Sequence, residues 1–499
     1  MRPRVTLAIL LAAAAAAVAP GALRAQDRPE GPLARTVAPL FQGRVWRYAT
    51  WGALVVSLTR GDTLLSYHAD RRFFPASNTK LFTTAAALHY LGADYRFLTA
   101  LFASGPEQEG TLYGDLVLYG TGDPEFALDT ADLAPFADSV VLAGIRDVRG
   151  DIVGNRAFLG PELEGPGWTP ENIDQWFAAP PSALGAAENL IAITVEPGDE
   201  RGTPAVVHVS PPNDYFRITS TVLTGRPRGR TRISVRRGSS SRDIALSGTI
   251  AGWRRRWTTY EVVREPAVFA ASLLRSLLEA RGVTISGTTR SETDDAAGRG
   301  RQLLAWARED PASDPPPAGA IAVRRSESLG DLVSMINHRS HNLSAELVFR
   351  AVGRSVGGAG TYASGARAVT QFLSDTVGIA PADFSVSDGS GLSLLDEATP
   401  RALVQLLAYE RHAPDGEVFW RSLPTAGDEL EGRMEDTPAE GRLRAKTGTL
   451  KNASTLAGYV TAADGEVLAF SIMVKDAWRI QRARRVQDQI GARLAQFSR

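Results

Sequence analysis

The amino-acid sequence predicts an α/β fold of the α+β kind, with one antiparallel sheet flanked by helices and with one or more β-rich domains inserted into it. Strand-like alternation of apolar residues occurs near both ends of the chain, at residues 52–58, 63–68, 442–449, 455–461 and 467–474. Helical patterns adjoin both groups of strands, whereas short strands with frequent Gly and Pro fill the middle. The chain of 499 residues is also too long for a single ordinary domain.

The helices are predicted from apolar residues at helical spacing and from their end signals. An amphipathic pattern covers residues 32–41, and Ser77 lies at the start of an apolar segment that stops at Gly92. Further helices are expected at residues 266–281, 329–337, 343–352 and 479–497. Residues 294–319 are rich in Asp, Pro, Gly and Ala, a composition that predicts an exposed loop.

The first residues have the layout of a secretory signal peptide. Arg2 and Arg4 precede an apolar run over residues 5–19, and cleavage is expected after Ala25. The run is short for a membrane span, so an uncleaved N-terminal anchor is the less favoured alternative. The sequence contains no Cys, which excludes disulfide bonds and a lipid-modified Cys anchor. We therefore expect a periplasmic protein with no transmembrane segment after removal of the signal peptide.

The change of pattern along the chain suggests a division into domains. After the signal peptide at residues 1–25, the expected main domain is discontinuous and consists of residues 26–95 and 262–499. Residues 96–261, where short strands prevail, are expected to form the inserted β-rich domain or domains. The two ends of the chain would then build one sheet around this insert.

The charges limit the possible partners. Lys+Arg and Asp+Glu both number 55, so the formal net charge is zero and no binding of nucleic acid is expected. Basic runs at residues 226–237 and 254–256 are interpreted as solvated loops or strand faces, in preference to a dedicated site for an anionic polymer. Lys occurs only at positions 80, 446, 451 and 475. Because Lys can lose its proton in a protein and Arg cannot, these four positions are candidates for chemistry.

The segment Ser77-Asn78-Thr79-Lys80 is the first candidate motif. Residues at i and i+3 of a helix share one face, with Cβ atoms roughly 5–6 Å apart. A serine at a helix start lies at the positive end of the dipole, and a neutral Lys beside it can remove its proton. The alternative is an N-cap serine with a surface lysine in the first turn. Such a pair also arises by chance, so the motif alone is weak evidence.

Two further motifs each occur once. Ser340-His341-Asn342 falls in the break between two predicted helices, where side chains can face a cleft. Lys446-Thr447-Gly448 lies on a predicted strand, where Gly leaves room for a ligand backbone and Lys with Thr can hold a carboxylate. A capped turn and a strand end with a Gly kink are the alternatives. The order of the three motifs, each on the expected type of element, makes the combination much stronger than its parts.

The chain resembles the class C low-molecular-mass penicillin-binding proteins, the D-alanyl-D-alanine carboxypeptidase/endopeptidase family, in which these motifs occur in this order. Other similar segments are Gly122-Asp123-Pro124, Pro180-Pro181-Ser182-Ala183-Leu184, Asp388-Gly389-Ser390-Gly391-Leu392-Ser393, Leu423-Pro424-Thr425-Ala426-Gly427 and Gly458-Tyr459-Val460. Together they cover nearly the whole chain after the signal peptide. The sequence departs from the family at His341, where Asp or Asn is usual, and after Gly427, where Gly-Thr-Leu is expected.

The resemblance implies a serine β-lactamase/transpeptidase-like domain and an acyl-enzyme mechanism. Ser77 would attack the carbonyl of the penultimate D-Ala of a peptidoglycan stem peptide, with Lys80 as the base. The expected roles of the other site residues are proton relay and substrate alignment by Ser340 and Asn342, carboxylate binding by Lys446 and Thr447 beside Gly448, and an oxyanion hole from the N–H groups of Ser77 and Thr449. Lys446 is also expected to lower the pKa of Lys80 by like charge.

This function implies peptidoglycan peptides as substrates and β-lactam antibiotics as covalent inhibitors. No cofactor is expected, and no metal, since His338 and His341 lack a carboxylate partner in a metal-binding motif. One alternative is a DD-endopeptidase that cleaves peptidoglycan cross-links at the same site. Another, of a different class, is a catalytically idle cell-wall-binding scaffold.

Overall fold

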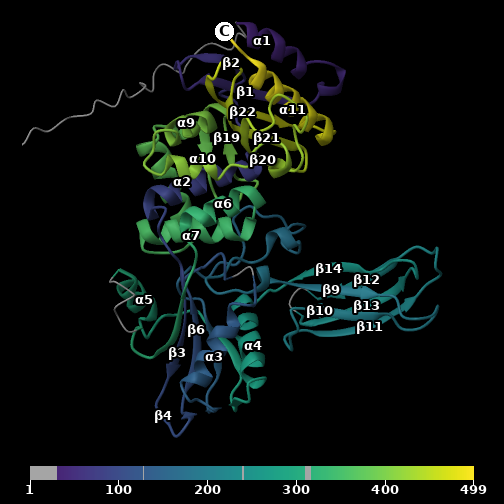
Figure 1. The fold of residues 1–499 in the computed structure, drawn as a ribbon, viewed down its shortest axis with the longest axis vertical. Coiled ribbons are helices and arrows are strands. Elements are labelled where there is room, and N and C mark those ends of the chain that lie inside the picture. The colour runs from purple at the N-terminus through teal and green to yellow at the C-terminus, as the bar shows by residue number, and fades with distance from the viewer. Residues whose placement is uncertain (1–30, 127–128, 239–240, 309–315) are drawn as a thin grey trace, which may run out of the picture.

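The computed structural model describes residues 31–126, 129–238, 241–308 and 316–499 (Figure 1). The expected signal peptide at residues 1–25 lies outside these residues. Within the described ranges, no helix is long and apolar enough to cross a membrane.

A five-stranded sheet joins the two ends of the chain. Its strand order is β2-β1-β22-β21-β20, and all neighbours are antiparallel. The strands are β1 (Thr50–Ser57), β2 (Thr63–Tyr67), β20 (Leu443–Leu450), β21 (Ala453–Thr461) and β22 (Val467–Lys475). Because side chains of a strand alternate between faces, Leu54 and Val56 enter one buried cluster while Ala53 and Val55 enter another.

Helices cover both faces of this sheet. The short helix α1 (Pro32–Val37) and the last helix α11 (Ile480–Gln496) bury one face with Leu33, Ile490 and Leu494. On the other face lie α2 (Thr79–Leu91), α6 (Leu329–Arg339), α7 (Asn342–Gly357), α8 (Tyr362–Gln371), α9 (Pro400–Glu410) and α10 (Gly416–Arg421). The predicted α+β arrangement is therefore confirmed.

A second domain has a mixed sheet with the strand order β16-β8-β6-β3-β17. Its strands are β3 (Leu98–Ser104), β6 (Asp115–Gly120), β8 (Ile152–Asn155), β16 (Thr289–Glu292) and β17 (Ala320–Arg325). Helices α3 (Leu133–Leu142) and α4 (Pro266–Glu279) pack on it, and a small sheet of β4 (Glu107–Gln108), β5 (Thr111–Leu112), β7 (Asp147–Val148) and β15 (Thr284–Ile285) lies at its edge.

The sheet pairing moves the end of the insert relative to the expected boundary at residue 261. Strand β16 pairs in parallel with β8, and β17 pairs with β3, although both follow residue 262. The chain returns to the helices of the first domain only at α6. The pairing of strands that are distant in the sequence determines where the insert ends, and the local sequence pattern near residue 262 does not encode this pairing.

The expected loop at residues 294–319 contains a helix, α5 (Arg299–Arg308). Asp295 accepts hydrogen bonds from the N–H groups of Arg299 and Gly300 and so caps the start of this helix. Leu303 is fully buried against the second domain. The loop prediction was therefore wrong here, because a composition rich in Asp, Pro and Gly concealed one short helix with a buried residue.

A third domain consists of two three-stranded sheets. One has the order β10-β9-β14, with β9 (Leu190–Glu196), β10 (Val206–Ser210) and β14 (Trp257–Val262). The other has the order β11-β13-β12, with β11 (Arg217–Thr224), β12 (Arg232–Arg237) and β13 (Asp243–Ile250). This domain projects sideways from the rest of the molecule (Figure 1).

Candidate active site

Ser77 lies in the 3-10 turn Ala76–Asn78 that leads directly into α2. The preceding residue, Ala76, has a φ of 48°, a left-handed conformation that is uncommon for a residue with a side chain. Such strain persists only where neighbouring contacts hold it. The backbone of Gly391 provides one of them, since a Cβ at Gly391 would lie 1.8 Å from the carbonyl oxygen of Ala76. The turn is thus held in place from outside the helix.

Lys80 is fully buried beneath Ser77 and is held by three acceptors. Its Nζ donates to Asn342 Oδ1 at 2.7 Å, to the carbonyl oxygen of Ser390 at 2.9 Å and to Ser77 Oγ at 3.1 Å. Burial lowers the pKa of Lys80 to about 8, although the nearby carboxylates of Glu346 and Asp388 act in the opposite direction. A neutral Lys80 is therefore accessible near neutral pH, within hydrogen-bond distance of the serine hydroxyl.

The second motif contributes Asn342 directly and Ser340 less directly. Asn342 begins α7, and its Nδ2 donates to the carbonyl oxygen of Phe177 at 2.8 Å, which connects Lys80 to the inserted segment. Ser340 ends α6 with a φ of 54° and lines a small neighbouring cavity of about 80 Å³. Among the described residues, no hydrogen bond joins Ser340 to Ser77 or Lys80.

His341, the departure from the family pattern, caps α7. Its Nδ1 accepts the backbone N–H of Ser344 at 3.3 Å, which is the capping function that Asp and Asn usually perform. Its Nε2 lies 3.5 Å from Glu188 Oε2. This contact lowers the pKa of Glu188. The segment after Gly427, the other departure, forms a short 3-10 turn over Asp428–Leu430.

The third motif lies on β20, the edge strand of the first sheet. Lys446 is buried, and its Nζ donates to the carbonyl oxygen of Thr447 at 3.2 Å. Burial and the nearby charge of Lys80 hold the pKa of Lys446 well below its usual value. Burial is the largest cause of the lowered pKa of Lys80, and the expected effect of Lys446 is not among its causes; the repulsion between the two cations lowers the pKa of Lys446 instead. The pair therefore resists carrying two protons.

Gly448 permits close contact between β20 and the serine turn. A Cβ at this position would lie 2.7 Å from the carbonyl oxygen of Pro75 and 3.1 Å from the N atom of Ser77. Thr455 on the neighbouring strand β21 also donates its hydroxyl to the carbonyl oxygen of Pro75, at 2.9 Å. The strand edge and the N–H of Ser77 are thus brought together, as an oxyanion site between these elements requires.

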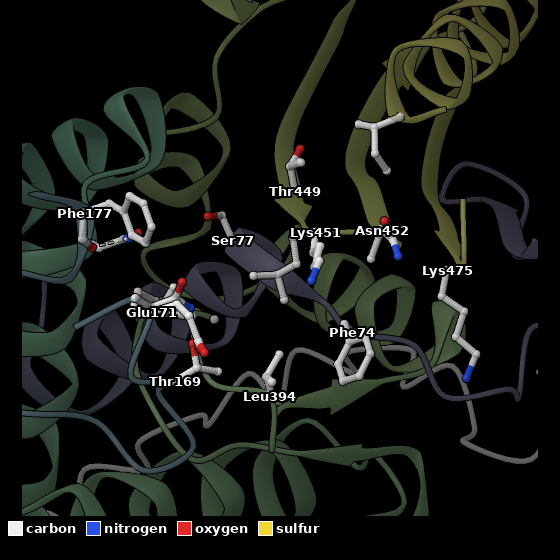
Figure 2. Close-up of a pocket in the computed structure, with 18 of the residues that line it drawn as sticks. Phe74, Ser77, Thr169, Glu171, Phe177, Leu394, Thr449, Lys451, Asn452 and Lys475 are labelled. Carbon is white, nitrogen blue, oxygen red and sulfur yellow. Dashed lines mark hydrogen bonds between the residues drawn. The ribbon is translucent and has the colours of Figure 1, made fainter. Parts of the chain in front are cut away.

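Ser77 opens into a cavity of about 1020 Å³ (Figure 2). Asn342 and Thr449 also line it, whereas Lys80, Lys446 and Gly448 are buried and do not line it. The cavity extends past the serine to the other two lysines of the sequence, Lys451 and Lys475, both labelled in Figure 2. All four lysines therefore lie in or beside one site. The scarcity of lysine in the sequence was a signal that could have identified Lys451 and Lys475 as residues of this site.

Two buried carboxylates that were not among the predicted site residues support Lys80. Glu346 accepts the N–H groups of Gly389 and Ser390 at 2.9 and 2.8 Å, and thereby fixes the carbonyl that Lys80 contacts. Asp388 accepts the N–H groups of Gly391 and Ser393, both at 2.7 Å, and the indole N–H of Trp168 at 2.8 Å. Burial and the charge of Asp388 raise the pKa of Glu346. The available sequence signal was the segment at residues 388–393, which is similar to the family and begins with Asp388.

A serine hydroxyl beside a buried lysine, at the start of a helix and open to a cavity, is the arrangement of an active-site-serine hydrolase. Comparison with known proteins agrees with this class. The profile of the D-Ala-D-Ala carboxypeptidase 3 (S13) family matches residues 38–497. The chain therefore belongs to this family, and it is a serine-type D-Ala-D-Ala carboxypeptidase.

Individual relatives give the same result. The D-alanyl-D-alanine carboxypeptidase of Actinomadura sp. (strain R39) is 33% identical over 464 residues, which cover 90% of this chain and 82% of the relative. The D-alanyl-D-alanine carboxypeptidase DacB of Haemophilus influenzae is 25% identical over 427 residues, covering 84% of each chain. The crystal structure of penicillin binding protein 4 from that organism has the same fold, with a TM-score of 0.78 at 22% identity over 92% of this chain and 99% of that one.

Proposed function

We propose that this protein removes the terminal D-Ala from peptidoglycan stem peptides through an acyl-enzyme on Ser77, with Lys80 as the general base. The observation that carries the proposal is the 3.1 Å contact between Lys80 Nζ and Ser77 Oγ, made by a buried lysine with a pKa lowered to about 8. A base with a pKa near the working pH is effective in proton transfer. Asn342 and the carbonyl of Ser390 hold the amine in place for this step.

In the acylation step, Ser77 Oγ attacks the carbonyl carbon of the penultimate D-Ala and its proton passes to Lys80. The N–H groups of Ser77 and Thr449 stabilise the oxyanion that forms. The C–N bond then breaks, and the proton returns from Lys80 to the amine of the departing D-Ala. Ser340 remains the expected relay for this proton, a role that requires its hydroxyl to turn toward the cleft. In deacylation, water attacks the acyl carbon and gives its proton to Lys80; the bond between this carbon and Ser77 Oγ then breaks, and Lys80 returns the proton to Ser77 Oγ.

Lys446 and Thr447 would receive the terminal carboxylate. In the empty site, Lys446 has a pKa well below its usual value. An incoming carboxylate favours the protonated form, so substrate binding would be coupled to proton uptake at Lys446. A β-lactam presents a strained amide beside a carboxylate and would use the same groups. Its ring-opened product stays attached to Ser77, and this accounts for covalent inhibition.

Export to the periplasm is part of this proposal. It rests on Arg2, Arg4 and the apolar run over residues 5–19. Cell fractionation with N-terminal sequencing tests it, and a cytosolic protein that still begins at Met1 would contradict it.

Two measurements test the proposed reaction. Fluorescent penicillin should label the protein covalently, and peptide mapping should place the label on Ser77; labelling elsewhere, or none, rejects the nucleophile. Mass spectrometry of wall fragments after incubation should show loss of single D-Ala residues. Cleavage of cross-linked dimers as the main product would instead favour a DD-endopeptidase, and an absence of any product would favour the scaffold.

A further inference from the structure

Two loops meet at one end of the third domain. Residues 225–231 follow β11 and residues 251–256 follow β13, and because these strands are parallel, both loops leave the sheet at the same end. The N–H of Gly225 donates to the carbonyl oxygen of Ile250 at 2.7 Å, and that of Ala251 to Thr231 Oγ1 at 3.1 Å. The two loops therefore form one connected surface.

Six exposed arginines lie on these loops, and we call this surface the arginine tip. Its members are Arg226, Arg228, Arg230, Arg254, Arg255 and Arg256. None of them forms an ion pair with a carboxylate in the part of the chain that the structure describes. Three arginines toward the other end of this domain behave differently, since Arg217, Arg237 and Arg242 pair with Asp243, Glu261 and Glu265.

An exposed tryptophan lies within the arginine tip. Trp253 is 65% exposed, although its indole N–H donates to the carbonyl oxygen of Gly229 in the other loop at 3.4 Å. The neighbouring loop between β9 and β10 adds the exposed carboxylates Asp199 and Glu200, together with Arg201. The arginines outnumber these acids, so the end of the domain keeps an excess of positive charge in a chain whose formal net charge is zero.

We propose that the arginine tip binds the surface of a membrane that contains anionic phospholipids. Each Arg close to an anionic membrane surface strengthens binding to it roughly fivefold. Arg is suited to phosphate because its planar group forms two parallel hydrogen bonds. Tryptophan favours the interface between head groups and acyl chains, where its ring is apolar on one side and its N–H is polar.

The position of the tip is consistent with this partner. The third domain projects from the molecule, away from the sheet and helices that form the active site (Figure 1). Contact through the tip would therefore leave the cavity at Ser77 open to wall substrates. The arginines alone could bind an anionic polymer in solution, and such binding would not require an exposed Trp253. The proposal does not depend on the reaction at Ser77.

The test is co-sedimentation of the full chain with vesicles of equal parts phosphatidylglycerol and phosphatidylethanolamine, compared with phosphatidylcholine vesicles. The loop variant is Arg254→Gln/Arg255→Gln/Arg256→Gln. The matched control variant, Arg149→Gln/Arg217→Gln/Arg421→Gln, removes the same charge from three exposed arginines that pair with carboxylates elsewhere. All proteins share the same N-terminus, so any contribution of residues 1–25 is common to them. Penicillin acylation shows that each variant is folded.

The wild type and the control variant should bind the anionic vesicles, and the loop variant should bind on the order of a hundredfold more weakly at low ionic strength. Binding should also fall in 0.5 M salt, and Trp253→Ala should weaken the part that salt does not remove. Equal binding of loop and control variants would overturn the proposal. So would equal binding to phosphatidylcholine, or binding to soluble polyphosphate without binding to vesicles.

Discussion

The candidate active site and the arginine tip both concentrate positive charge, but they use different residues in different surroundings. The active site has Lys80 and Lys446, both buried, with Lys451 and Lys475 on the same cavity. The positive charge of the tip comes from arginine alone, and all six of these arginines are exposed to water. Burial lowers the pKa of both buried lysines, and such a shift brings Lys but not Arg into a range where the proton can be lost. Lys80 and Lys446 are thus placed where a proton can be lost, and the arginines of the tip where charge is kept.

The largest expected effect comes from Lys80→Arg. Guanidinium keeps the charge but has no accessible neutral form, so it cannot remove the proton of Ser77. The rate of acylation by penicillin should fall by roughly 10²–10⁴-fold, the usual contribution of a general base. Lys451→Arg is the matched control, because this exposed lysine lines the cavity without contacting Ser77, and its rate should stay within a few-fold of wild type. A Lys80→Arg variant that acylates at a near wild-type rate would exclude Lys80 as the base.

The pH dependence of acylation also tests the assignment of Lys80 as the base. Only neutral Lys80 acts as a base, and its pKa is lowered to about 8. With saturating penicillin, whose carboxylate keeps Lys446 protonated, the first-order rate of acylation should therefore rise about tenfold for each pH unit below that value and level off above it. Because Lys80 and Lys446 repel one another, the observed midpoint belongs to the pair. A rate that is flat from pH 6 to 9, or that falls through this range, would contradict the assignment.

Much of this site could be predicted from the sequence because its geometry is local. Ser77 and Lys80 share a helix face by their spacing alone, and each of the other motifs falls on its expected type of element. Motif order and family resemblance placed Asn342 in the site, but its contact with Lys80, which spans the whole insert, was not predicted. The positions of helices and strands along the chain were also well predicted where the apolar pattern extended over many residues.

Other parts depend on contacts that no local pattern encodes. Glu346 acts on Lys80 through the backbone of Ser390, and nothing in the sequence relates these two positions. The end of the second domain depends on the parallel pairing of β16 with β8. Helix α5 was missed because it is short and rich in Arg, with Leu303 as its only fully buried side chain, and because it lies in a segment rich in Asp, Pro and Gly. Long-range register and buried polar contacts were thus the features beyond the reach of the sequence.

Lys446→Arg should have a smaller effect than Lys80→Arg. The variant keeps a cation for the carboxylate of the ligand, but the larger guanidinium has to fit a fully packed position behind Thr447. We expect about a tenfold loss in the acylation rate with penicillin, on the scale of one imperfect charged contact. With a penicillin ester, which lacks the carboxylate, wild type and variant should differ less. A loss as great with the ester as with penicillin would show that Lys446 acts on the chemistry and not on the carboxylate.

The smallest effect is expected at the arginine tip, where arginine is replaced by lysine. Lysines introduced by Arg254→Lys/Arg255→Lys/Arg256→Lys would be exposed to water and would keep their protons at neutral pH, so the surface keeps its charge. Binding to anionic vesicles should stay within a few-fold of wild type, with a small loss because ammonium cannot form the paired hydrogen bonds of guanidinium. Acylation by penicillin should not change, since the tip lies on the projecting domain away from Ser77. If these lysines abolished vesicle binding as completely as Gln at the same positions, attraction by charge could not be the basis of the contact. The shape of the guanidinium group would then determine vesicle binding. The tip would need more than positive charge, and its contrast with an active site that needs a removable proton would no longer hold.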